Sequence, residues 1–173
     1  MQRLVKLIII ITFIFIVVIF YLSLGKDNSY NTANLVGKKI DTIDLQSFDD
    51  EKFVNTQDFK DNSFTLINFW ASWCGPCRAE HSILMSLKDS RSLILVGVNF
   101  KDKKKNAKNF LEELGNPYSI LLKDENGKKS INFGIYGIPE SILLNKELVI
   151  IEKFVGPLVK EDYEKILEEI GEK

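Results

Sequence analysis

Hydrophobic and polar residues form two patterns along the chain, and the first is an apolar block near the N-terminus. Leu7–Leu24 carries no charge and follows Arg3 and Lys6. As a helix this block would be about 27 Å long, close to the roughly 30 Å of a bilayer's hydrocarbon core. Residues 1–25 are therefore predicted to form a membrane anchor. A cleaved signal peptide is the alternative, because Ser23-Leu24-Gly25 offers a small-x-small site, although signal peptides have shorter apolar regions.

The charges beside this block predict its orientation. Arg3 and Lys6 are expected to stay on the cytoplasmic side, which sends the rest of the chain across the membrane. Residues 26–37 are polar and aperiodic and are predicted to be a linker. Residues 38–173 are long enough for one domain of ordinary size. We therefore expect a single-pass protein with an extracytoplasmic C-terminal domain.

The second pattern, over residues 38–173, alternates short apolar runs with segments of helical periodicity. Phe64–Trp70 and Leu93–Phe100 are nearly continuous apolar runs, typical of central strands that are buried on both faces. The other predicted elements are a hairpin of residues 43–45 and 52–54, a helical turn at 56–59, strands at 118–122, 141–144 and 149–154, and helices ending near Lys88 and at 106–114, 129–133 and 161–170. This order predicts an α/β fold with a central mixed sheet and helices on both faces.

Composition and charge change this picture little. The formal net charge is −1, and apolar residues make up 45% of the chain, as in ordinary globular proteins. The one basic run, Lys101–Lys105, is most simply a solvated loop or helix start. Because no basic stripe accompanies it, nucleic-acid binding is not expected.

The chain has only two cysteines, Cys74 and Cys77, placed where a buried strand gives way to a helix. A small secreted protein stapled by disulfides would carry more cysteines, spread along its length. A cysteine at a helix start lies beside unpaired N–H groups and the positive end of the helix dipole. Both favour the thiolate, which is the nucleophile in disulfide exchange. Pro76 suits the first helical turn, and Gly75 allows another backbone to come close, so the pair is predicted to be redox-active.

The two cysteines allow three other interpretations. A structural disulfide closing so short a loop would restrain little of the unfolded chain. A metal site of Cys74, Cys77 and His81 would still lack the fourth ligand that structural zinc requires. Covalent haem attachment is excluded, because it needs histidine directly after the second cysteine and Arg78 is there instead. Apart from the Cys74–Cys77 disulfide, we expect no metal or cofactor.

A family resemblance is carried by residues 69–77, Phe-Trp-Ala-Ser-Trp-Cys-Gly-Pro-Cys. This stretch, with Trp73 next to the cysteines, resembles the active site of thioredoxin-like proteins. Residues 78–81, Arg-Ala-Glu-His, are similar to the DsbE/CcmG branch, the periplasmic reductases of cytochrome c maturation. Further similarity to that branch lies in residues 97–102, 114–118 and 133–141. The resemblance covers about residues 36–170 and implies a thioredoxin-like fold.

The resemblance also implies roles for single residues. Pro139 would be the cis-proline that packs beside the redox pair and helps hold the partner's chain; an ordinary trans loop proline is the alternative. Glu140 would line the site, unless it is a plain surface carboxylate. Thioredoxin has a buried aspartate where this chain has Asn68, which cannot accept a proton. The acid that takes the proton of the resolving thiol is therefore expected to be Glu140 or Glu80.

The function implied is that of a thiol–disulfide reductase in the periplasm, anchored in the cell inner membrane. Cys74 would attack a disulfide and Cys77 would resolve the mixed species. Its partners would be a membrane reductant of the DsbD/CcdA type and oxidised apocytochrome c or haem-ligation proteins, whose cysteines it keeps reduced. A general extracytoplasmic reductase or an oxidase of the same fold is one alternative. A non-catalytic haem or copper chaperone that uses the thiols as ligands is another.

Overall fold

The structure is a computed structural model that describes residues 2–24, 35–59 and 63–172. The chain divides into two compact units, residues 1–31 and 32–173. Most of the linker predicted at residues 26–37 lies outside the described residues.

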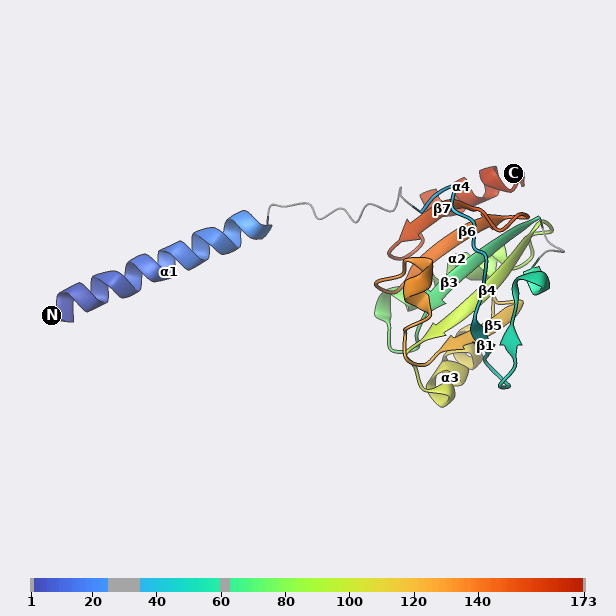
Figure 1. The fold of residues 1–173 in the computed structure, drawn as a ribbon, viewed down its shortest axis with the longest axis horizontal. Coiled ribbons are helices and arrows are strands. Elements are labelled where there is room, and N and C mark those ends of the chain that lie inside the picture. The colour runs from blue at the N-terminus through green and yellow to red at the C-terminus, as the bar shows by residue number, and fades with distance from the viewer. Residues whose placement is uncertain (1, 25–34, 60–62, 173) are drawn as a thin grey trace. The chain divides into compact units, whose positions relative to one another are not determined.

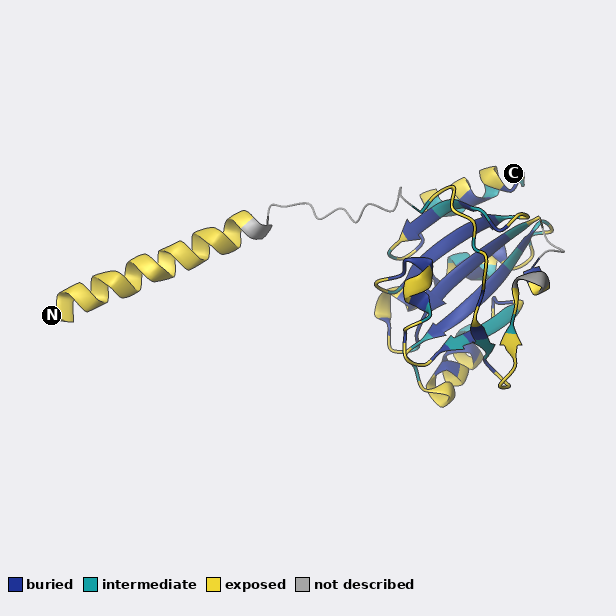
Figure 2. Cartoon of the chain, in the orientation of Figure 1, coloured by how far each residue is buried: buried dark blue, intermediate teal, exposed yellow. Residues whose placement is uncertain are grey.

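The first unit consists of one long helix, α1 (Gln2–Leu24). The stretch Gln2–Leu22 is long and apolar enough to cross a membrane, judged by length and composition, and its most apolar window has no buried residue. Figure 2 shows α1 as exposed wherever the burial of its residues is described. The prediction of a long apolar helix at this position is therefore confirmed.

The second unit is built on a seven-stranded sheet in the order β2-β1-β5-β4-β3-β6-β7 (Figure 1). Its strands are β1 (Leu45–Ser47), β2 (Phe53–Val54), β3 (Phe64–Trp70), β4 (Leu93–Phe100), β5 (Ile120–Asp124), β6 (Glu140–Asn145) and β7 (Ile150–Val155). The central strands β3, β4 and β5 are parallel, whereas β6 and β7 continue the sheet antiparallel on one side and β1 and β2 on the other. The predicted mixed sheet is confirmed.

The two faces of the sheet are covered differently. Buried residues of three helices, α2 (Gly75–Leu87), α3 (Lys104–Leu114) and α4 (Lys160–Glu169), share one core cluster with Leu66 and Trp70 of β3. The alternate β3 residues Ile67 and Phe69 belong to a second cluster on the other face. There the short 3-10 helices η1 (Thr56–Phe59) and η2 (Ser130–Phe133) provide the cover, through Phe59 and Phe133. Helices on both faces were predicted, and those on the second face prove to be single turns.

One strand begins later than its sequence pattern predicts. The strand expected at residues 118–122 is β5 (Ile120–Asp124), because Tyr118 turns its ring into the core instead of joining the ladder. A Cβ on Gly97 would lie only 2.6 Å from that ring, so the glycine in the middle of β4 makes room for Tyr118. The tyrosine thus reaches the helical face of the sheet, where it contributes to the site described below.

Candidate redox site

The two cysteines form a disulfide at the N-terminus of α2, directly after the central strand β3. Cys74 is the N-cap residue of the helix, and its Sγ accepts a hydrogen bond from the Cys77 N–H at 3.2 Å. Pro76 lies in the first turn, as predicted. Both cysteines are buried, with exposed fractions of 5% and 2%. A thiolate on Cys74 would therefore receive an N–H bond and the helix dipole in a largely desolvated place.

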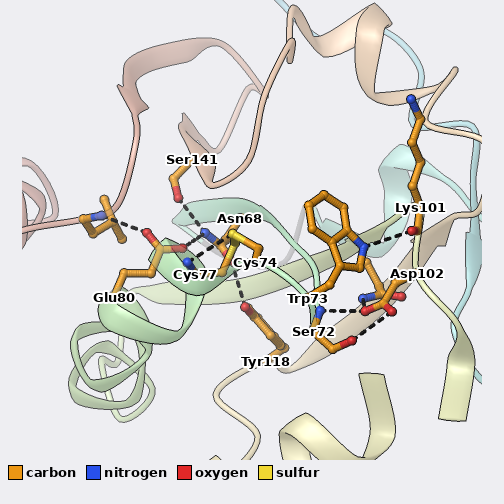
Figure 3. The surroundings of a disulfide bond; sticks show 12 residues. Asn68, Ser72, Trp73, Cys74, Cys77, Glu80, Lys101, Asp102, Tyr118 and Ser141 are labelled. Carbon is orange, nitrogen blue, oxygen red and sulfur yellow. Dashed lines mark hydrogen bonds between the residues drawn. A yellow bond between two sulfur atoms is a disulfide. The ribbon is translucent and has the colours of Figure 1, made fainter. Parts of the chain in front are cut away.

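The loop before Cys74 is fixed by the turn that follows β4. Asp102 accepts hydrogen bonds from the N–H and the hydroxyl of Ser72, at 2.6 and 2.9 Å, and from the Asn99 amide at 3.1 Å. The indole N–H of Trp73 donates to the carbonyl of Lys101 at 3.1 Å. Figure 3 shows the contacts of Ser72 and Trp73 near the disulfide. Trp73 itself remains 60% exposed and offers an apolar surface next to Cys74.

A buried polar network lies behind the cysteines and is centred on Asn68 of β3 (Figure 3). The Asn68 amide donates to Glu80 at 2.8 Å and to the Ser141 hydroxyl at 3.0 Å. The Tyr118 hydroxyl donates to the Asn68 carbonyl oxygen at 2.7 Å. The second carboxylate oxygen of Glu80 accepts from the Leu158 N–H at 2.8 Å. Asn68 therefore cannot act as the buried acid of thioredoxin does. Its amide instead positions an acid from another element, Glu80 of α2.

Glu80 is the titratable group of this network. Its burial raises the pKa to about 7, with a smaller contribution in the same direction from Asp162, while hydrogen bonds from Leu158 and Asn68 act in the opposite direction. Burial, followed by the nearby charge of Glu80, raises the pKa of Tyr118, which stays a neutral donor. Cys77 and Glu80 are three residues apart on one helix and so share a face. Glu80 therefore lies on the same face of α2 as Cys77, with a pKa near neutral pH, and its role as the proton acceptor stays a prediction.

Pro139 directly precedes β6, and the Ile138–Pro139 peptide bond is cis, as the resemblance implies. The carbonyl of Pro139 accepts a hydrogen bond from the Gly156 N–H at 3.0 Å. Ile138 packs against the core cluster that contains both cysteines. The cis bond is therefore located at the end of the sheet that carries the redox pair.

Glu140 follows Pro139, but its carboxylate is already engaged. It forms an ion pair with Lys153 at 2.7 Å and accepts from the N–H groups of Gly137 and Tyr136 at 2.9 and 3.2 Å. It is also buried, so it is no surface carboxylate. Of the two acids proposed as proton acceptors, the structure favours Glu80.

His81 is held in place by a backbone hydrogen bond and by packing against an aromatic ring. Its Nε2 donates to the Gly115 carbonyl at 3.0 Å, and its ring meets Phe110 edge-on at 5.3 Å between centroids. Burial lowers its pKa, against the opposing effect of its backbone hydrogen bonds. Within residues 2–24, 35–59 and 63–172, no three His, Cys, Asp or Glu side chains are grouped so that they could hold a metal ion. That the site needs no metal stays a prediction.

Four residues of the site were not assigned from the sequence: Tyr118, Ser141, Asp102 and Lys153. The sequence pattern places Tyr118, Ser141 and Lys153 inside predicted strands and gives none of them a role in the site. The glycine in the apolar run of β4 was a usable signal, because a missing Cβ in a strand indicates a close neighbour. A lysine within a buried strand was a second signal, because lysine is almost never fully buried unless it is paired.

Comparison with known proteins agrees with a redox role for this site. Residues 35–169 match the Redoxin family. A thiol:disulfide interchange protein DsbE of Pasteurella multocida (strain Pm70) is 32% identical over 167 residues, which cover 96% of this chain and 92% of the relative. The thiol:disulfide interchange protein HelX of Rhodobacter capsulatus is 37% identical over 134 residues, or 78% of this chain and 75% of the relative. The crystal structure of a DsbE-type protein from Chlorobium tepidum superimposes with a TM-score of 0.64 at 26% identity, covering 78% of this chain and 94% of that one.

Proposed function

The chain belongs to the Redoxin family and, within it, to the DsbE-type thiol:disulfide interchange proteins, and from this premise we propose that it is an extracytoplasmic reductase of apocytochrome c cysteines. The observation that carries the proposal is the Cys74–Cys77 disulfide at the start of α2, with Glu80 buried one turn further along the same helix. Haem attaches to a Cys-x-x-Cys-His sequence in c-type cytochromes, and its two thiols must be reduced for ligation.

The exchange takes place in two steps. The Cys74 thiolate attacks one sulfur of the client disulfide, forming a mixed disulfide and releasing the other client sulfur as a thiolate. Cys77 then loses its proton to Glu80 and attacks Cys74 Sγ, which frees the second client sulfur. Two electrons pass from the dithiol to the client, and the protein is left as the Cys74–Cys77 disulfide.

The proposed location is the periplasmic surface of the cell inner membrane. Support comes from the apolar helix α1, which is long enough to span a bilayer, and from the positive charges that precede it. Anchoring would keep the redox domain near a membrane reductant of the DsbD/CcdA type, which would return the Cys74–Cys77 disulfide to the dithiol. Reduction by such a partner is needed after every turnover, because each cycle consumes two electrons.

The direction of electron flow can be tested by measuring the reduction potential of the Cys74–Cys77 pair. The Gly-Pro dipeptide between the cysteines is that of thioredoxin. We therefore expect a reducing value in the region of the thioredoxin potential, about −270 mV. The measurement is equilibration of the soluble domain in glutathione or dithiothreitol buffers, read out by thiol alkylation. A value near that of the oxidant DsbA, about −120 mV, would contradict the reductase and favour an oxidase.

A further inference from the structure

A buried lysine on β7 has no role in the exchange chemistry. The side chain of Lys153 is fully buried, and its Nζ lies 2.7 Å from the Glu140 carboxylate, which is itself only 5% exposed. Desolvating two charges costs several kcal/mol per ion, and replacing a buried pair by apolar side chains is often neutral or stabilising. Stability alone is therefore a weak reason for a buried ion pair at this place.

Both members of the pair also bind the loop that leads into the cis-proline. Lys153 Nζ donates to the carbonyl of Gly134 at 2.6 Å. One oxygen of Glu140 accepts from the N–H groups of Tyr136 and Gly137. The ion pair thus holds the beginning of the loop 134–138 through the lysine and its end through the glutamate. Bonds of this kind, with one charged partner, are stronger than neutral hydrogen bonds.

This loop reaches the redox pair at its far end. Ile138 packs against the cluster of Cys74 and Cys77, and Pro139 follows in the cis conformation. In the sheet, Glu140 pairs with Phe69, so the loop lies where β3 delivers the chain to the cysteines. Tyr136 donates its backbone N–H to Glu140, yet the residue is 69% exposed. The loop is therefore both rigidly held and open to a partner.

We propose that Lys153 is a positioning residue for client docking: through Glu140 and Gly134 it fixes the loop 134–138 in the shape on which the client's polypeptide chain lies while Cys74 reacts. The proposal rests on the thiol–disulfide exchange proposed above. The partner it concerns is an extended peptide segment around a disulfide, because the loop can contribute only if atoms beyond the reacting sulfurs make contact. A small disulfide without a peptide backbone needs Cys74 alone.

The test compares two oxidants of the reduced domain. The first is a disulfide-bonded Cys-x-x-Cys-His peptide, and the second is bis(2-hydroxyethyl) disulfide, which has no backbone. In Lys153→Met the side-chain volume is kept while the charge is lost. We expect KM for the peptide to rise about tenfold or more, because a small displacement of a docking element is costly. The rate with the small disulfide should stay within about twofold of wild type, because the cysteines are not displaced.

Two further variants keep the result interpretable. Lys165→Met removes an exposed lysine that pairs with Glu152 of β7, and it should leave both reactions unchanged. Glu140→Gln/Lys153→Met leaves no unpaired buried charge, so it is expected to fold even where the single variant does not. Because the Lys153 ammonium no longer donates to the Gly134 carbonyl, the KM of this double variant for the peptide should also rise.

The readouts separate failure of this inference from failure of the proposed function. Equal loss of both reactions in the folded double variant, or an unchanged KM for the peptide, would overturn the positioning role of Lys153. Failure of the wild-type protein to react with either disulfide would instead refute thiol–disulfide exchange itself. A selective rise in KM for the peptide supports the inference.

Discussion

Cys77→Ser is expected to hold its client covalently on Cys74. The first step needs only the Cys74 thiolate, which is placed at the N-cap of α2. Without the Cys77 thiol the mixed disulfide cannot be resolved, so the complex should accumulate while turnover falls to the rate without protein. The measurement is non-reducing electrophoresis of membranes that contain the variant, followed by identification of the captured chain and of the cysteine that it carries.

The matched control for this trap is Cys74→Ser, in which the attacking sulfur is absent and the buried Cys77 remains. It should capture no partner, because Cys74 is the N-cap residue whose sulfur receives the helix N–H bond, and Cys77 is not. Equal capture by both variants would contradict the assignment of Cys74 as the nucleophile. Loss of bound haem or copper from Cys77→Ser, without any covalent capture, would instead support a metal or haem chaperone.

Glu80→Gln is expected to slow the resolving step about a hundredfold, at the lower end of what a positioned acid–base group contributes. In wild type the pKa of Glu80 is about 7, because the side chain is buried. Below pH 7 the acid is protonated and cannot take the Cys77 proton; above pH 7 it is ionised and can. The rate of resolution should therefore rise with pH through about 7 in wild type, and this inflection should be missing in the variant.

Stopped-flow measurement of mixed-disulfide decay from pH 5 to 9 would show this difference. Glu168→Gln is the matched control, because it neutralises an exposed carboxylate on α4. It should keep the wild-type profile. A wild-type profile in Glu80→Gln would show that the proton leaves by another route, and Glu140 or bulk water would have to be considered again.

Much of the fold could be predicted because its elements have strong local patterns. The apolar runs of β3 and β4 match the predicted bounds, since a strand buried on both faces is one continuous apolar run in the sequence. The predicted helix at 106–114 begins two residues earlier, at Lys104. Helix ends are weakly encoded where no side chain caps them, and Lys103 makes no side-chain cap bond.

The parts of the site that are adjacent in sequence could be predicted, whereas contacts between distant residues could not. Cys74 and Cys77 could be found because the motif and the strand–helix junction are adjacent in sequence. The network around Asn68 joins residues far apart in the chain: Ser141 is 73 positions away, and Tyr118 is 50. No single-sequence pattern encodes such contacts. Glu140 was therefore considered a proton acceptor, and only its pairing with Lys153 shows why Glu80 suits that role better.

The most direct test of the reductase is to mix its reduced domain with one equivalent of a disulfide-bonded Cys-x-x-Cys-His peptide and to count thiols on both by alkylation and mass spectrometry. The account predicts that the peptide gains two thiols while the protein loses two and forms the Cys74–Cys77 disulfide. If the peptide stays oxidised while Cys74 and Cys77 both stay reduced, the reductase function is contradicted.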